Sequence, residues 1–261
     1  MKYSVETFRQ MKNQTLIPML TAYTYPVARC IEKAGIPAIL VGDSVGMVEM
    51  GLASTRDVTI EMMQYHVAAV HRGAPDTHII GDLPFNTDSD PETALLNARR
   101  LVDAGADSIK LEGPKYDVIQ HLIENHIDVV GHTGLTPQTA VDFKQVGVNK
   151  QDAERISDEA NGLLQAGVFM LILEHIPSEL ADAITSTVSI PTIGIGAGAS
   201  CDGQVLVIND ELGLGDYWPP FSKQYANISA DIQVVAEHFA QEVRQREFPD
   251  NIIKLNFSSN K

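Results

Sequence analysis

The sequence predicts an α/β protein built as a (β/α)8 TIM barrel, and three observations support this prediction. Apolar stretches of strand length alternate with amphipathic helix patterns, which is typical of parallel strands joined by crossover helices. A length of 261 residues with 44% hydrophobic residues suits one such barrel. Polar residues recur where consecutive strands end, and a closed barrel would gather those ends at one mouth, whereas an open sheet would scatter them.

One local pattern occurs three times along the chain. An Ala-Gly pair ends a helix and leads into an apolar strand that closes with an acid. The pairs stand at 34–35, 104–105 and 166–167, and the acids are Asp43, Glu112 and Glu174. A strand ending at Asp82 and another ending at His132 lack the Ala-Gly pair. Strand ends are therefore the expected location of the chemistry.

The first half of the chain gives four strands and four helices. The expected strands cover residues 16–22, 38–42, 78–82 and 106–113, and the expected helices cover 1–15, 27–33, 59–72 and 91–104. Thr59 is the expected N-cap of the third helix. Asp90 and Pro91 supply an N-cap and a first-turn proline for the fourth. Residues 42–46 are the expected loop after the second strand, and residues 47–56 show no clear period.

The second half repeats the alternation. The expected strands cover residues 127–131, 168–174, 190–195 and 204–208, and the expected helices cover 115–126, 152–165, 177–185 and 229–246. Residues 209–227 are rich in Gly, Pro and aromatic residues and are expected to be irregular. No composition shift marks a second domain. We expect residues 1–261 to form a single barrel domain with a short N-terminal helix and a C-terminal helix.

Composition narrows the class of partner. A net charge of -15 and a pI near 4.8 argue against nucleic acid and anionic membrane, because both reward clustered Lys and Arg. Cys30 and Cys201 form no disulfide framework, which fits a reducing compartment. The sequence has neither a signal-peptide pattern nor an apolar run of membrane-spanning length. We therefore expect a cytoplasmic protein that acts on a small molecule.

The strand from Ala106 to Gly113 shows why the mouth should be reactive. Its period of two puts Ser108, Lys110 and Glu112 on one face, away from the apolar residues between them. An ammonium and a carboxylate in an apolar strand are costly to bury unless they pair or hold a ligand. A solvated salt bridge on an edge strand is the alternative for this segment alone.

The barrel would bring four carboxylates to one mouth, with a lysine and a histidine among them. These residues are Asp43, Asp82, Glu112, Glu174, Lys110 and His132. Crowded carboxylates repel each other unless a cation or protons intervene, and oxygen-only ligands favour Mg²⁺. A 2-oxo acid can chelate Mg²⁺, which acidifies the adjacent carbon. Glu174, on the strand farthest from Asp43 and Asp82, is the candidate base.

Several stretches together resemble a known family. They are residues 20–23 (LTAY), 41–47 (VGDSVGM), 81–85 (GDLPF), 110–113 (KLEG), 131–138 (GHTGLTPQ), 194–198 (GIGAG) and 202–204 (DGQ). This combination is similar to the ketopantoate hydroxymethyltransferase family over about residues 16–248. The resemblance implies a barrel of the phosphoenolpyruvate mutase and isocitrate lyase superfamily, and a homo-oligomer, commonly a decamer.

The resemblance also implies an activity and its residues. Family members transfer a hydroxymethyl group from 5,10-methylenetetrahydrofolate to 3-methyl-2-oxobutanoate, giving 2-dehydropantoate for pantothenate biosynthesis through a Mg²⁺-stabilised enolate. The Mg²⁺ positions match Asp43, Asp82 and Glu112. The oxo-acid contacts match Asp43, Ser44, Asp82 and Lys110, and His132 matches a site histidine. Glu174 matches the catalytic base.

The chain departs from the family pattern around the mouth of the barrel. Thr24 stands where an Asp is usual, and Pro114 where a second small residue is common. Residues 143–150 replace a longer glycine-containing stretch, and residues 215–221 are also unusual. The metal-binding pattern is intact.

Two other readings of the sequence remain open. The first is a Mg²⁺-dependent lyase or decarboxylase that acts on another 2-oxo acid without folate. The second is a non-catalytic barrel that only binds an oxo acid, whose binding would be indifferent to Glu174→Gln.

Overall fold

The computed structural model describes residues 2–215 and 218–249 of the chain. Its centre is a closed barrel of eight parallel strands in sequence order, completed by pairing of the first strand with the last. The strands are β1 (Ile17–Thr21), β2 (Ala38–Val41), β3 (His78–Asp82), β4 (Ser108–Lys110), β5 (Val129–Gly134), β6 (Met170–Glu174), β7 (Thr192–Ile195) and β8 (Gly203–Leu206). The predicted (β/α)8 fold class is confirmed.

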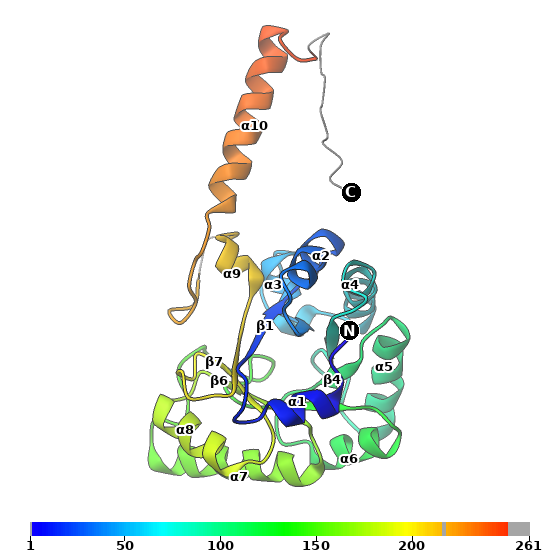
Figure 1. Cartoon of the computed structure of the whole chain (residues 1–261), viewed down its shortest axis with the longest axis vertical. Coiled ribbons are helices and arrows are strands. Elements are labelled where there is room, and N and C mark those ends of the chain that lie inside the picture. The colour runs from blue at the N-terminus through cyan, green and yellow to red at the C-terminus, as the bar shows by residue number, and fades with distance from the viewer. Residues whose placement is uncertain (1, 216–217, 250–261) are drawn as a thin grey trace.

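Most helices run along the outside of the barrel (Figure 1). They are α1 (Val5–Met11), α2 (Tyr25–Lys33), α3 (Val45–Val48), α4 (Ile60–Gly73), α5 (Pro91–Asp103), α6 (Tyr116–Glu124), α7 (Lys150–Ala166), α8 (Ser178–Thr187), α9 (Ile208–Leu212) and α10 (Ile228–Gln245). Both predicted caps are confirmed, because the side chains of Thr59 and Asp90 accept hydrogen bonds from the backbone N–H groups of Met62 and Thr93.

The core has two parts, one between the strands and the helices and one inside the barrel. Phe8 of α1 belongs to the inner part. Its ring is fully buried and lies 5.1 Å from the ring of His78 and 6.3 Å from that of Phe169. Lys12, just after α1, donates to Asp202 of the β7–β8 loop at 2.7 Å. The N-terminal helix therefore closes the amino end of the barrel.

Several strands are shorter than expected at one or both ends, and the expected last strand, 204–208, ends at Leu206 because Ile208 begins α9. Two of the differences change where site residues lie. β4 ends at Lys110, because Gly113 takes a left-handed backbone conformation (φ 82°) and its N–H bonds to the carbonyl of His132. Glu112 consequently lies in the loop after the strand. β5 starts later and extends to Gly134, pairing with β6 as far as Glu174. His132 therefore lies inside a strand, although the expected strand ended just before it.

Helices and loops also differ in places. Short helices α3 and α9 form in two stretches that were expected to be irregular. Residues 196–202 join β7 to β8 without a helix, so the glycine-rich segment is a tight barrel loop. No helix in the described ranges has the length and apolar character that crossing a bilayer requires.

Helix α10 stands away from the barrel (Figure 1). None of its residues is buried, although it carries several large apolar side chains. The exposed apolar residues on it are Ile232, Val234, Val235, Phe239 and Val243.

His78 provides a test of the packing at the amino end. Its ring contacts the carbonyl of Tyr3 at 3.0 Å and the hydroxyl of Ser108 at 2.9 Å. Burial lowers the pKa of His78 below its ordinary value. The unfolded chain therefore binds more protons than the folded chain between about pH 6.5 and the lowered pKa.

We expect the free energy of unfolding to fall as the pH drops through this window, and to fall less in His78→Gln. The measurement is urea unfolding of both proteins at several pH values. The difference between the two plots of unfolding free energy against pH removes the contributions of the titratable groups that both proteins share. Parallel curves would show that His78 is not held neutral by the fold.

Candidate active site

A cavity of about 650 Å³ opens at the carboxyl ends of the strands. Six of the seven predicted site residues are Asp43, Ser44, Asp82, Lys110, Glu112 and Glu174, and all six line it. The seventh, His132, is fully buried and contacts two of these residues. The strand-end argument had singled out all of these residues except Ser44, which came from the family resemblance, and the barrel brings them together.

Lys110 lies between two carboxylates at the base of the cavity. Its ammonium group lies 2.8 and 3.0 Å from the two oxygens of Asp82, and 3.5 Å from Oε1 of Glu112. All three side chains are buried. The attraction of the surrounding carboxylates outweighs the effect of burial, so the pKa of Lys110 is raised and its charge is retained.

Asp43 sits beside this pair at the end of β2. Its backbone N–H donates to Oδ2 of Asp82 at 3.3 Å, which fixes the loop against β3. Burial and the charge of Asp82 raise the pKa of Asp43 well above its usual range. Asp43 and Asp82 therefore disfavour charge on each other, and Lys110 only partly relieves this repulsion.

His132 links Glu112 to Glu174 across the cavity wall. Its Nδ1 lies 3.6 Å from Oε1 of Glu112, and its Nε2 lies 3.2 Å from Oε2 of Glu174. Burial opposes a charge on the ring, but the two carboxylates outweigh this effect and raise the pKa of His132 to about 9. For Glu112, Lys110 and His132 overcome the effect of burial and lower the pKa to about 2.

Glu174 ends β6, and its backbone is held by the neighbouring strand. Gly134 has φ 102°, and a Cβ at this position would come within 2.3 Å of the carbonyl oxygen of Glu174. The N–H of Leu135 donates to the same oxygen at 2.8 Å. A glycine is thus required where β5 passes Glu174. The Glu174 side chain is 17% exposed and faces the cavity from the wall opposite β2.

Ser44 has a partner that the sequence did not reveal. Its hydroxyl lies 2.8 Å from the hydroxyl of Tyr23, which is almost fully buried. This contact orients Ser44 at the cavity rim.

Gln138 is the main site residue to which the sequence assigned no role. It is buried, and its side-chain amide donates to Oδ2 of Asp43 at 2.9 Å. Its backbone N–H donates to Oε2 of Glu112 at 3.1 Å, and its carbonyl accepts from Arg56 at 2.6 Å. Gln138 therefore positions two of the three carboxylates expected to bind metal.

The donor set fits a hard divalent cation. Asp43, Asp82 and Glu112 supply only oxygen, and their combined charge exceeds that of Lys110. Within residues 2–215 and 218–249, no three His, Cys, Asp or Glu side chains already stand together as a metal cluster. This arrangement is compatible with Mg²⁺, which usually uses one or two carboxylates and keeps several waters.

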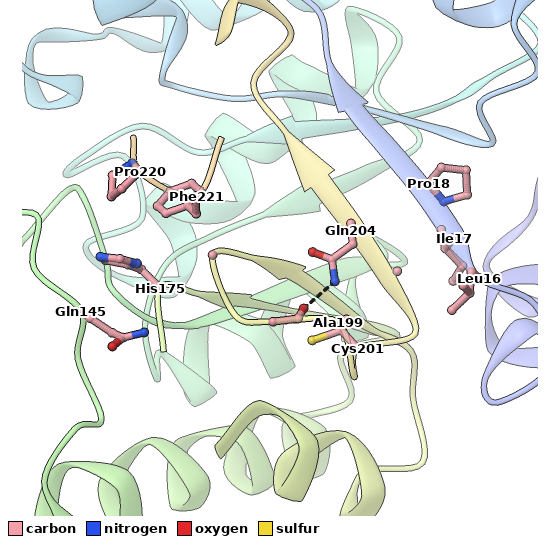
Figure 2. Close-up of a pocket in the computed structure, with 13 residues that line it drawn as sticks. Leu16, Ile17, Pro18, Gln145, His175, Ala199, Cys201, Gln204, Pro220 and Phe221 are labelled. Atoms are coloured by element: carbon pink, nitrogen blue, oxygen red, sulfur yellow. Dashed lines mark hydrogen bonds between the residues drawn. The ribbon is translucent and has the colours of Figure 1, made fainter. Parts of the chain in front are cut away.

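A second cavity of about 980 Å³ lies outside β1 and β8, beside the loop that joins β7 to β8. Figure 2 shows Leu16 and Pro18 on one side of it and His175 and Phe221 on the other. The described residues around it include no carboxylate and no lysine. The acid–base chemistry therefore belongs to the mouth cavity.

Comparison with known sequences identifies close relatives. The sequence model of ketopantoate hydroxymethyltransferase matches residues 2–251. A 3-methyl-2-oxobutanoate hydroxymethyltransferase of Thermus thermophilus is 45% identical over 256 residues, which is 95% of this chain and 98% of the relative. One of the same name from Pyrobaculum neutrophilum is 45% identical over 236 residues, covering 88% of this chain and 90% of the relative.

Comparison with solved structures shows the same fold at low sequence identity. A 2,3-dimethylmalate lyase of the PEP mutase/isocitrate lyase superfamily has a TM-score of 0.63 and 14% identity, covering 99% of this chain and 92% of that chain. Phosphonopyruvate hydrolase, solved with oxalate and Mg²⁺, also has a TM-score of 0.63, with 13% identity, covering 96% of this chain and 92% of that chain.

Gln138 yields a prediction about the metal site. Gln138→Leu leaves an oxygen of Asp43 without its hydrogen-bond donor, so we expect Mg²⁺ affinity to fall by about 10- to 100-fold. Isothermal titration with Mg²⁺ measures this change. The adjacent Thr139→Val, whose side chain contacts only Thr136, is the matched control. An unchanged Mg²⁺ affinity in Gln138→Leu would contradict the assignment.

Proposed function

This chain belongs to the ketopantoate hydroxymethyltransferase family, and from that premise we propose that its mouth cavity is where a hydroxymethyl group is transferred to 3-methyl-2-oxobutanoate, giving 2-dehydropantoate. The proposed donor is 5,10-methylenetetrahydrofolate, with water supplying the new hydroxyl and tetrahydrofolate leaving. The observation that carries this proposal is that Lys110 and the four predicted carboxylates line one cavity of about 650 Å³; these are Asp43, Asp82, Glu112 and Glu174.

We propose that the oxo acid binds at the base of this cavity. Lys110 is charged and lies at the cavity wall, so it can bind an oxygen of the anionic substrate. Ser44, held by Tyr23, can donate a second hydrogen bond from the β2 side. Asp43 and Asp82 border the same space, and His132 supports it from beneath through Glu112.

Mg²⁺ would be held by Asp43, Asp82 and Glu112, whose oxygens and excess negative charge suit it. When bound there, it supplies positive charge that makes the carbon next to the keto group more acidic. Gln138 keeps Asp43 and Glu112 in place for this role. The Mg²⁺ in the phosphonopyruvate hydrolase structure belongs to a relative in fold alone.

Glu174 is the proposed general base that removes the proton from C3 of the oxo acid. It lies on the cavity wall opposite β2, and it is partly exposed to the cavity. His132, 3.2 Å away, orients its carboxylate. After losing its proton, C3 of the oxo acid attacks the one-carbon unit of 5,10-methylenetetrahydrofolate.

The first experiment isolates the proton transfer. Proton NMR of 3-methyl-2-oxobutanoate in D2O with enzyme and Mg²⁺, without folate, should show loss of the C3 proton signal. In Glu174→Gln this exchange should slow by about 10²- to 10⁴-fold, because the base is missing. Glu179→Gln removes an exposed acid on the neighbouring helix and serves as the control.

Other results of the same experiment would change the proposal. Exchange that persists at the wild-type rate in Glu174→Gln would remove Glu174 from its role. Exchange that appears only after tetrahydrofolate is added would show that the donor must close the site first. Turnover of an oxo acid without any folate would favour the lyase or decarboxylase reading.

We also propose that the protein is a cytoplasmic homo-oligomer, with the family's decamer as the expected form. The observation that supports association is α10, whose residues are all unburied and which carries an apolar stripe. The stripe consists of Ile232, Val235, Phe239 and Val243, which share one helix face. A stripe of this kind is normally covered in the native assembly.

Sedimentation velocity should therefore give a mass several times the chain mass of 28.4 kDa. Introducing charge into the stripe with Val235→Asp and Phe239→Asp together should reduce this mass. Gln241→Asp adds one negative charge on the opposite face and should not, so Val235→Asp alone is the charge-matched comparison. A wild-type protein that sediments as a single chain would refute association.

A further inference from the structure

Asp210 is a cavity residue to which the proposed mechanism gives no role. It lies on α9, which follows β8 directly, and its carboxyl group lines the same mouth cavity as Asp43 and Glu174. The residue is only 6% exposed. Its carboxyl is therefore shielded from bulk water but faces the space into which ligands enter.

The carboxyl of Asp210 has no hydrogen-bond or ion-pair partner among the described residues. Glu211, the adjacent residue on the helix, is also an acid, and Tyr23, just after β1, is close enough for the charge of Asp210 to raise its pKa. Burial alone raises the pKa of Asp210 to about 6. Its carboxyl faces the cavity without a protein donor, so a ligand in the cavity can supply the missing hydrogen bonds.

The cavity has room for a second molecule beside the oxo acid. A volume of about 650 Å³ far exceeds what a five-carbon acid fills. Apart from its charged groups, the lining of the cavity is mostly apolar. The apolar residues of this lining include Met47, Val48, Leu135, Leu214, Pro219 and Phe221. Apolar walls with one carboxyl at the edge suit a flat ring that presents N–H donors.

We propose that Asp210 binds the N–H edge of the pyrimidine ring of the folate donor, accepting parallel hydrogen bonds from its ring N–H and its 2-amino group. A carboxylate accepts such a pair of donors through both of its oxygens. A metal ion is a poorer occupant, because no neighbouring carboxylate contributes to the raised pKa of Asp210 and the adjacent Glu211 does not line the cavity. This inference rests on folate being the donor, as proposed above.

The test is binding of tetrahydrofolate, measured by isothermal titration in the presence of Mg²⁺ and 3-methyl-2-oxobutanoate. Asp210→Asn keeps the size of the side chain but replaces one acceptor oxygen with a donor. We expect its affinity for tetrahydrofolate to fall by about 10- to 100-fold, as for a lost hydrogen bond to a charged group. Glu211→Gln removes the adjacent acid, which does not line the cavity, and should bind as the wild type does.

A donor analogue separates direct recognition from a general effect. A 2-desamino tetrahydropterin should bind the wild type more weakly than tetrahydropterin, but Asp210→Asn should distinguish the two much less. Binding of 3-methyl-2-oxobutanoate alone reports whether the rest of the cavity is intact in the variant.

Three outcomes would overturn the inference. Unchanged tetrahydrofolate affinity in Asp210→Asn would do so, as would an equal loss in Glu211→Gln, which would indicate a long-range charge effect. Equal discrimination between the two pterins by wild type and variant would also do so. Failure of the wild type to bind tetrahydrofolate or to transfer a hydroxymethyl group would instead refute the proposed donor, and the inference with it.

Discussion

The whole site depends on a lysine ammonium that is buried among carboxylates. Lys110 contacts Asp82 closely and Glu112 more distantly, and its charge makes the burial of both acids tolerable. Without it, the strand ends would present like charges to each other in a low-dielectric space. The carboxylate oxygens that Lys110 does not neutralise make the cavity suitable for a divalent cation, and the ammonium group of Lys110 makes it suitable for an anionic oxo acid.

The positions of these charges are set by backbone contacts between neighbouring strands and loops. The N–H of Asp43 reaches Asp82, and the N–H of Gln138 reaches Glu112, so each carboxylate is oriented by a different part of the chain. Gly134 allows β5 to pass close to Glu174. Rigid positioning of this kind is the protein's main contribution to a reaction in which a proton must leave a carbon atom.

Much of this arrangement could be predicted because apolar strands that end in acids are visible in the sequence. Asp43, Asp82, Glu112 and Glu174 all follow that pattern, and the barrel brings them together. The extension of β5 through His132 was missed because its last residues are polar, although strand pairing buries them. Gln138 could not be found, since its role depends on contacts with residues 26 and 95 positions away. Asp210 follows the apolar end of β8 and could have been recognised by the same pattern.

The closure of the barrel has a consequence for the order in which the chain can fold during synthesis. Phe8 is among the first residues to leave the ribosome, but its packing partner Phe169 is synthesised much later. Lys12 likewise cannot pair with Asp202 until the last strands have been made. β1 likewise pairs with β8 only when nearly the whole barrel has been translated. The N-terminal segment must therefore remain unpaired for most of synthesis, which makes it a natural site for early chaperone contact.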